Sequence, residues 1–151
     1  MNLSNIWLLL AGSSCIMVSL LHVAIIVGGA DWYRFFGAGE RMALMAENGS
    51  LYPALVTGAI ALLFAGWAAL AFAADRMGES ILIKAGLIAV TAIFLLRGLL
   101  GFAVIGWAQQ PWLLELQARP MFLMVSSLVC LLIGLVLAAG VADLPGRISA
   151  A

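Results

Sequence analysis

Four long runs of apolar residues, separated by three shorter polar connections, dominate the chain. The runs cover residues 6–29, 51–73, 81–108 and 121–141. Each can cross the hydrocarbon core of a bilayer as a helix, because a span needs about 20 apolar residues at a rise of about 1.5 Å per residue. The pattern therefore predicts an all-α membrane protein, a single domain over residues 1–151 that forms an antiparallel bundle of four transmembrane helices.

The composition supports a membrane environment. Of 151 residues, 66% are hydrophobic and 9% are charged, whereas soluble domains are about 45–50% apolar and about 25% charged. Seven basic and seven acidic residues give a net charge of zero. A nucleic-acid-binding surface needs clustered basic residues, which this sequence lacks. We therefore expect the lipid bilayer as a partner and no nucleic acid.

The first connection, residues 28–50, is the richest in polar and aromatic side chains. It reads GGADWYRFFGAGERMALMAENGS and holds three of the seven acids and four aromatic residues. Asp31 is suited to cap a short turn over residues 32–36, and residues 40–47 can form two further helical turns. A loop exposed to water rarely carries so much apolar surface. We expect this connection to lie at the membrane interface or to re-enter the mouth of the bundle.

The other two connections set the topology. Residues 74–80 form a tight polar turn, and residues 109–120 predict a short helix lying in the interface. Both termini fall on the side of the 74–80 turn, here named side A, and the other two connections fall on side B. Lys and Arg near the spans number three on each side, so the positive-inside rule gives no orientation. We expect cytoplasmic termini, because the aromatic-rich first connection is less typical of a cytoplasmic loop.

The N-terminal apolar run lacks the features of a cleaved signal. No Lys or Arg precedes Arg34, and the run is longer than the apolar region of a signal peptide. We expect this run to be retained as the first helix.

Two basic side chains lie at membrane depth, His22 in the first run and Arg97 in the third. An arginine at the bilayer centre costs at least about 2.5 kcal/mol, so Arg97 should bind a carboxylate or several carbonyls. None of the four runs contains an acid. Glu40 follows a Gly-Ala-Gly bend, and we predict that it reaches Arg97. If the first and third helices touch, Tyr33 and His22 complete a buried polar cluster. Secondary candidates for this cluster are Asp31, Arg34 and Ser19.

This cluster has three possible roles. A buried ion pair can fix the register of helices without any chemistry. An ionisable residue within a membrane is also a candidate ligand or substrate site, and the same group can face a partner protein. The helix face of His22 carries small and polar residues, which favours helix packing, with a ligand-facing stripe as the alternative.

Cofactor and metal chemistry finds little support in the sequence. The single histidine cannot provide two axial ligands to haem, and zinc sites need several Cys or His ligands. Cys15 and Cys130 lie in separate apolar runs without a CxxC motif. We therefore predict no cofactor, no metal and no assigned catalytic residue.

Two stretches carry a resemblance to a known group of proteins. Residues 22–53, HVAIIVGGADWYRFFGAGERMALMAENGSLYP, and residues 95–98, LLRG, resemble an uncharacterised family of small four-helix proteobacterial inner-membrane proteins. The resemblance implies a location in the bacterial inner membrane, and it lends no activity.

Together these features predict a small integral membrane binding or accessory protein. It would hold a lipid, a quinone or a partner helix near the His/Arg/Glu cluster, within a larger membrane complex or as a homodimer. One alternative is a small homodimeric transporter of dual topology, like the small multidrug resistance transporters. Those transporters need an acid within a span, and none of the four runs contains one. The other is a membrane enzyme with His22 or Glu40 as general base. The enzyme is less favoured because the sequence shows no complete catalytic set.

Overall fold

The computed structural model describes residues 5–77, 80–107 and 120–144. These residues form α1 (Ile6–Phe35), α2 (Glu40–Glu47), α3 (Tyr52–Met77), α4 (Ile81–Trp107) and α6 (Pro120–Ala142). The four longer helices are long and apolar enough to span a membrane, which confirms the predicted all-α architecture with four spans. The predicted interfacial helix between the last two spans lies outside the described residues.

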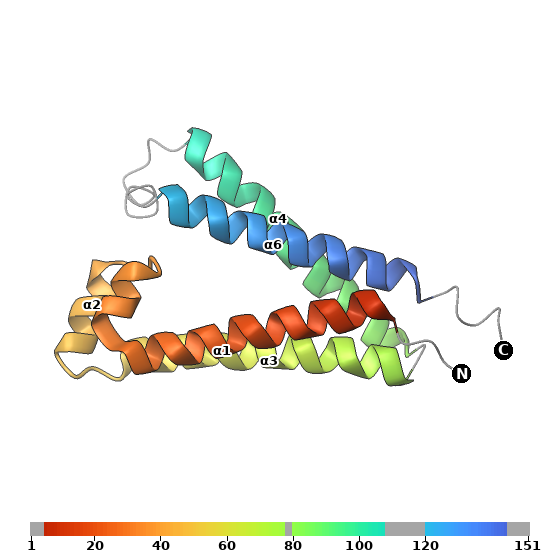
Figure 1. Cartoon of the computed structure of the whole chain (residues 1–151), viewed down its shortest axis with the longest axis horizontal. Helices are drawn as coiled ribbons and strands as arrows, with labels where there is room; N and C mark the ends of the chain where they lie inside the picture. The colour runs from red at the N-terminus through yellow and green to blue at the C-terminus, as the bar shows by residue number, and fades with distance from the viewer. Residues whose placement is uncertain (1–4, 78–79, 108–119, 145–151) are drawn as a thin grey trace.

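The helices form two arms that meet at one end. α1 packs mainly on α3, and α4 packs mainly on α6. Figure 1 shows these two pairs converging where the described chain begins and ends, on side A, and separating toward side B. We name α1, α2 and α3 the first arm, and α4 and α6 the second arm.

A buried asparagine holds the arms together on side A. The side-chain oxygen of Asn5 accepts hydrogen bonds from the backbone N–H groups of Trp7 (3.1 Å) and Leu8 (3.2 Å), and so caps α1. Its side-chain amide donates to the carbonyl of Gly140 on α6 at 2.9 Å, and its backbone N–H donates to Asp75 on α3. One residue thus links the ends of three helices, a role that the sequence analysis did not identify.

Aromatic rings form a further contact between the two arms. Phe94 of α4 lies 5.3 Å from Trp67 and 5.8 Å from Phe64, both on α3, between ring centroids. Edge-on pairs at this spacing are favourable beyond the area that they bury. Trp67 lies inside a span rather than at its end because it belongs to this aromatic contact.

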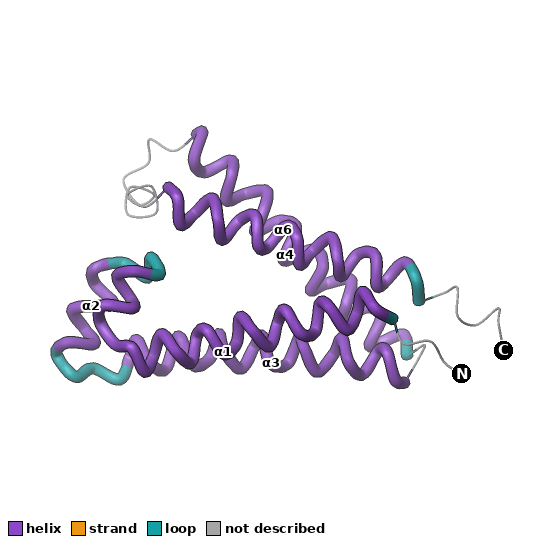
Figure 2. Tube along the Cα trace, viewed as in Figure 1, coloured by secondary structure: helices purple, strands orange, loops and turns teal. Residues whose placement is uncertain are grey.

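The first connection folds back over the first arm. The backbone of α1 leaves helical geometry at Gly29, where φ is +68°, a conformation that glycine adopts readily. Figure 2 shows α2 between its two loop segments, and α2 packs on α1 and α3. A Cβ added to Gly37 would lie 2.7 Å from the ring of Phe122, at the start of α6. The loop before α2 therefore touches the second arm on side B.

Candidate functional site

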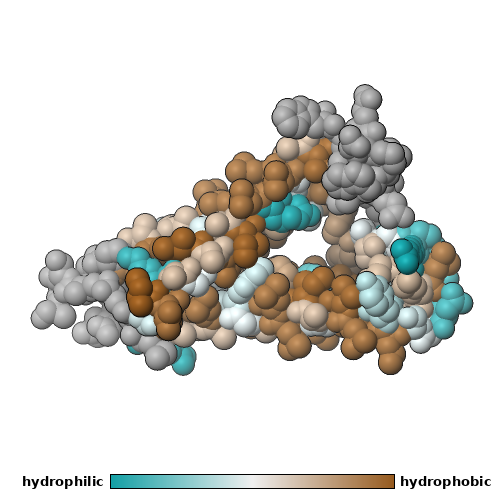
Figure 3. All heavy atoms as spheres, turned by 180° about the vertical axis from the view of Figure 1, so that it is seen from behind, coloured by the Kyte–Doolittle hydropathy of each residue, from teal (hydrophilic) through white to brown (hydrophobic). Residues whose placement is uncertain are grey.

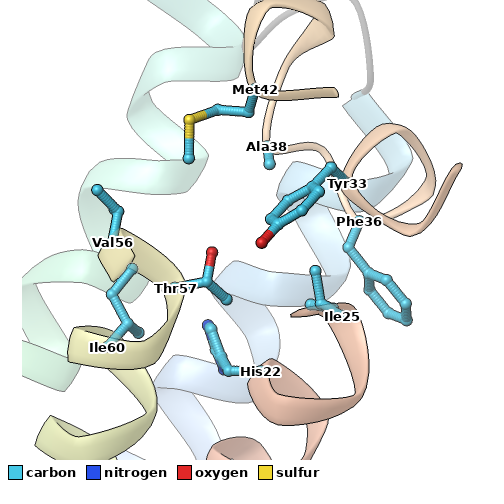
Figure 4. Close-up of a pocket in the computed structure, with 9 residues that line it drawn as sticks. All are labelled: His22, Ile25, Tyr33, Phe36, Ala38, Met42, Val56, Thr57 and Ile60. Atoms are coloured by element: carbon cyan, nitrogen blue, oxygen red, sulfur yellow. The ribbon is translucent and has the colours of Figure 1, made fainter. Parts of the chain in front are cut away.

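A pocket of about 300 Å³ lies within the first arm, toward side B. Figure 4 shows the side chains that line it, contributed by α1, α2, α3 and the loop after α1. They are His22, Ile25, Tyr33, Phe36, Ala38, Met42, Val56, Thr57 and Ile60. We name this space the first-arm pocket.

The break at Gly29 makes the pocket possible. In a continuous helix, Tyr33 would lie about 16 Å along the axis from His22, given a rise of about 1.5 Å per residue. Because the backbone turns at Gly29, Tyr33 folds back toward His22, and both side chains line the same space. The local sequence Gly28-Gly29 thus brings two distant parts of α1 together.

The hydroxyl of Tyr33 is the least satisfied polar group in this space. Tyr33 is 2% exposed, and among the described residues its hydroxyl has no hydrogen-bond partner. Figure 4 shows this hydroxyl and that of Thr57 pointing toward one another across the pocket. Leaving a buried polar group unpaired costs about 1–3 kcal/mol, and folded proteins rarely do so. The arrangement favours an occupant that supplies a hydrogen-bond acceptor.

His22 adds an oriented ring nitrogen to the same pocket. Its Nδ1 lies 2.7 Å from the carbonyl oxygen of Val18. A carbonyl oxygen only accepts, so Nδ1 carries the proton and donates, which leaves Nε2 for another partner. The imidazole also stacks on Phe64, with centroids 5.5 Å apart, and Figure 4 shows a ring nitrogen pointing into the pocket. The ring is therefore held in place by the protein and presents Nε2 to an occupant.

Glu40 is bound by Arg34, and this corrects the expected pair between Glu40 and Arg97. Nε and Nη2 of Arg34 lie 3.0 Å and 2.8 Å from Oε1 of Glu40. Nη1 of Arg34 also contacts Glu47 at 2.7 Å and Asp31 at 3.5 Å. Arg34 and Glu40 are six residues apart on one arm, whereas Arg97 belongs to the other arm. We name these four side chains the Arg34 cluster, which ties both ends of α2 to the end of α1.

Arg97 contacts a hydroxyl on the neighbouring helix. Its Nη1 donates to Oγ of Ser127 on α6 at 3.4 Å, and Ser127 is fully buried. The predicted cluster therefore divides into three sites. His22 and Tyr33 share the first-arm pocket, Glu40 joins the Arg34 cluster, and Arg97 lies on the second arm.

Ser19, a secondary candidate, serves helix packing. Its hydroxyl donates to the carbonyl of Ala61 on α3 at 2.8 Å, and the residue is buried. This contact fits the packing interpretation of the small and polar face of α1.

Two hydroxyl residues escaped the sequence analysis, although a signal for each was available. Thr57 is the only Ser or Thr in the second apolar run, residues 51–73. Ser127 and its neighbour Ser126 are hydroxyl residues within the fourth apolar run. A lone hydroxyl in an otherwise apolar span is a polar group that needs a partner, and Thr57 could have been chosen on that ground.

Metal ligands are not grouped in the part of the chain that the structure describes. No set of three or more His, Cys, Asp or Glu side chains there is placed to hold a metal ion. Cys15 and Cys130 are free thiols.

Comparison of the chain with protein-family models, curated proteins and solved structures gives no match. The resemblance noted from residues 22–53 stays a prediction, and the case for function depends on the geometry of the sites.

Proposed function

We propose that this integral membrane protein binds an uncharged, largely apolar molecule that carries a carbonyl or hydroxyl oxygen, such as a quinone or a neutral lipid. The observation that carries this proposal is the buried hydroxyl of Tyr33, which points into the first-arm pocket and has no hydrogen-bond partner among the described residues. An oxygen of the ligand would accept its hydrogen bond and remove the cost of the unpaired group.

The lining of the pocket favours an uncharged ligand. Among the described residues that line the pocket, His22 is the only titratable side chain apart from Tyr33, and none is a carboxylate, Lys or Arg. A charged ligand would lose its hydration without gaining a counter-charge. Thr57 and Nε2 of His22 can accept a hydrogen bond from a ligand hydroxyl, so the pocket suits a molecule with oxygens at both ends of a ring.

The size of the pocket limits how much of the ligand it encloses. About 300 Å³ is at the lower end of ligand pockets, which run from about 300 to 1,000 Å³. It has room for one ring system or a short polar head. A longer apolar tail would extend into the bilayer.

The proposed setting is the bacterial inner membrane, with both termini in the cytoplasm. Support comes from the sequence resemblance and from the aromatic-rich connection on side B. In this setting the protein acts as a binding or accessory protein, either as a homodimer or as a subunit of a larger membrane complex. Reporter fusions at the C-terminus test the orientation. A single orientation supports this role, and mixed orientations would favour the dual-topology transporter.

Equilibrium dialysis of the full-length protein in detergent micelles tests the ligand class. The probe is a benzoquinone that carries one isoprenoid unit, and empty micelles correct for partitioning. Tyr33→Phe keeps the ring and removes one hydrogen bond of about 1 kcal/mol, so we expect about fivefold weaker binding. Tyr52→Phe is the matched control, because Tyr52 is 56% exposed and lies outside this pocket. Equal affinities for the wild type and Tyr33→Phe would overturn the proposal.

A further inference from the structure

The two arms separate toward side B and leave a gap between them. Figure 3 shows this opening from the opposite side, with apolar surface on both arms and hydrophilic atoms of the second arm at its edge. The opening closes again where the loop at Gly37 meets Phe122. The gap is distinct from the first-arm pocket, which lies among α1, α2 and α3.

Arg97 is an exposed residue on the face of α4 that carries Phe94. It follows Phe94 by three residues, and residues three apart share a helix face. Phe94 contacts Phe64 and Trp67 of α3, so Arg97 lies one turn nearer side B, where the arms have separated. Val104 ends the candidate span, which places Arg97 about 10 Å inside it at about 1.5 Å per residue.

The surroundings of Arg97 leave space for its guanidinium between α4 and α6. A Cβ added to Gly101, one turn further along α4, would overlap Oγ of Ser127 and would lie 2.7 Å from Nη1 of Arg97. Glycine at this position therefore lets the guanidinium reach Ser127, whose hydroxyl is anchored on the carbonyl of Leu123 at 2.6 Å. The position of the cation is set by the helix pair.

The charge of Arg97 is not balanced by any described side chain. A guanidinium has five N–H donors, and the structure assigns one of them, to Ser127. Among residues 5–77, 80–107 and 120–144, no carboxylate forms an ion pair with Arg97. A second copy of the chain would bring no acid to this depth either, because none of the four apolar runs contains one.

We propose that Arg97 binds the phosphate of an anionic phospholipid whose acyl chains occupy the gap between the two arms. Phosphate oxygens can accept two parallel hydrogen bonds from a guanidinium, and the long side chain can reach toward the headgroup region. The apolar walls and the lateral opening suit acyl chains. This site does not depend on the proposed function of the first-arm pocket.

Lipid titration of the full-length protein, followed by native mass spectrometry, tests the proposal. The probes are phosphatidylglycerol and phosphatidylcholine with identical acyl chains. Both lipids carry the phosphate, but the choline cation of phosphatidylcholine offsets its charge, so we expect the wild type to bind phosphatidylglycerol about tenfold more tightly. Arg97→Gln should abolish this preference. Arg41→Gln, the matched control, removes a cation of α2 that lines a separate pocket with Met45 and Tyr52, and should keep the preference.

Arg97→Lys replaces Arg97→Gln in this test if Arg97→Gln does not fold, because lysine retains the positive charge at this depth. An ammonium cannot form the paired contact of a guanidinium, so we expect the preference for phosphatidylglycerol to fall by about threefold. An unchanged preference in the foldable Arg97 variants would overturn the proposal. The proposal would also be overturned if oleate bound more tightly than phosphatidylglycerol, or if the protein retained a protein partner in place of lipid.

Discussion

Arg34 and Arg97 carry the same charged group in contrasting surroundings. Arg34, in the last turn of α1, contacts three carboxylates from the first connection. Arg97, inside the span of α4, contacts one serine hydroxyl on α6. At the end of a span the chain supplies counter-charges within a few residues of the arginine. Inside the span of α4 the sequence has no acid, and no described carboxylate pairs with Arg97, so we infer that its charge serves a group from outside the chain.

The two arms differ in their cover on side B and in the charge of the side chains beside their cavities. The first arm is covered on side B by α2, and no described charged side chain lines the first-arm pocket. The second arm has no such cover among the described residues, and its cation lies beside the gap. We infer that the first arm suits a small neutral ligand and the second an anionic lipid. The predictions that follow test this contrast, from the largest expected effect to the smallest.

Breaking the link between the arms should have the largest effect on stability. Asn5→Ala removes the N-cap of α1, worth about 1 kcal/mol, and leaves the buried carbonyl of Gly140 unpaired, at about 1–3 kcal/mol. We expect a loss of about 2–4 kcal/mol in the free energy of unfolding in mixed micelles. Asn48→Ala is the control, because the Asn48 amide donates to the exposed carbonyl of Leu44 within its own turn and to no other described residue. Similar losses for both variants would contradict the role given to Asn5.

Filling the space at Gly101 should weaken the second arm. Gly101→Ala places a methyl group against Ser127 and Arg97, and overpacking of this kind costs about 1–3 kcal/mol. Gly66→Ala is the matched control on α3, since its Cβ would meet nothing within 4 Å. Unfolding in mixed micelles should show Gly101→Ala destabilised and Gly66→Ala at least as stable as the wild type. Ser127→Ala should restore part of the loss, and equal stability of the two glycine variants would argue against close packing at Gly101.

Removing the unpaired hydroxyl should stabilise the ligand-free first arm. Tyr33→Phe keeps the buried ring and deletes a group that costs about 1–3 kcal/mol when unpaired, so we expect about 1 kcal/mol of added stability. Thermal unfolding of delipidated protein measures this difference, with Tyr52→Phe expected to match the wild type. If Tyr33→Phe is destabilised, the hydroxyl has a partner that the proposal does not include.

The smallest effect concerns the pairing of Glu40. A double-mutant cycle with Glu40→Gln and Arg34→Gln should show coupling at low ionic strength that shrinks in salt, because exposed ion pairs are screened. The cycle with Glu40→Gln and Arg97→Gln should be additive, as expected for distant sites. Coupling of Glu40 to Arg97 alone would restore the pair predicted from the sequence.

The sequence predicted the elements of the fold well. Apolar runs and their polar breaks located four spans to within a few residues, except at the side B end of α1, which continues beyond its break at Gly29. Residues 40–47 matched α2. These features depend on local patterns of hydrophobicity and glycine position, which can be read along the chain.

The arrangement of the site was harder to predict because it depends on which helices touch. Depth along a helix follows from residue number, and it placed both His22 and Arg97 at membrane depth. The neighbours do not follow from depth, and α1 packs mainly on α3 rather than on α4. The sequence placed His22 and Tyr33 in one cluster, and both line the first-arm pocket. It also gave Glu40 to Arg97, and it missed Thr57 across the pocket.

Native mass spectrometry of the protein, released gently from its membrane, tests the central claim of two separate sites most directly. The wild type, Tyr33→Phe and Arg97→Gln are compared for retained small molecules. We predict that Tyr33→Phe loses a neutral adduct and keeps an anionic phospholipid, and that Arg97→Gln shows the reverse. Loss of the same adduct in both variants would mean one shared site, and no loss in either would contradict both assignments.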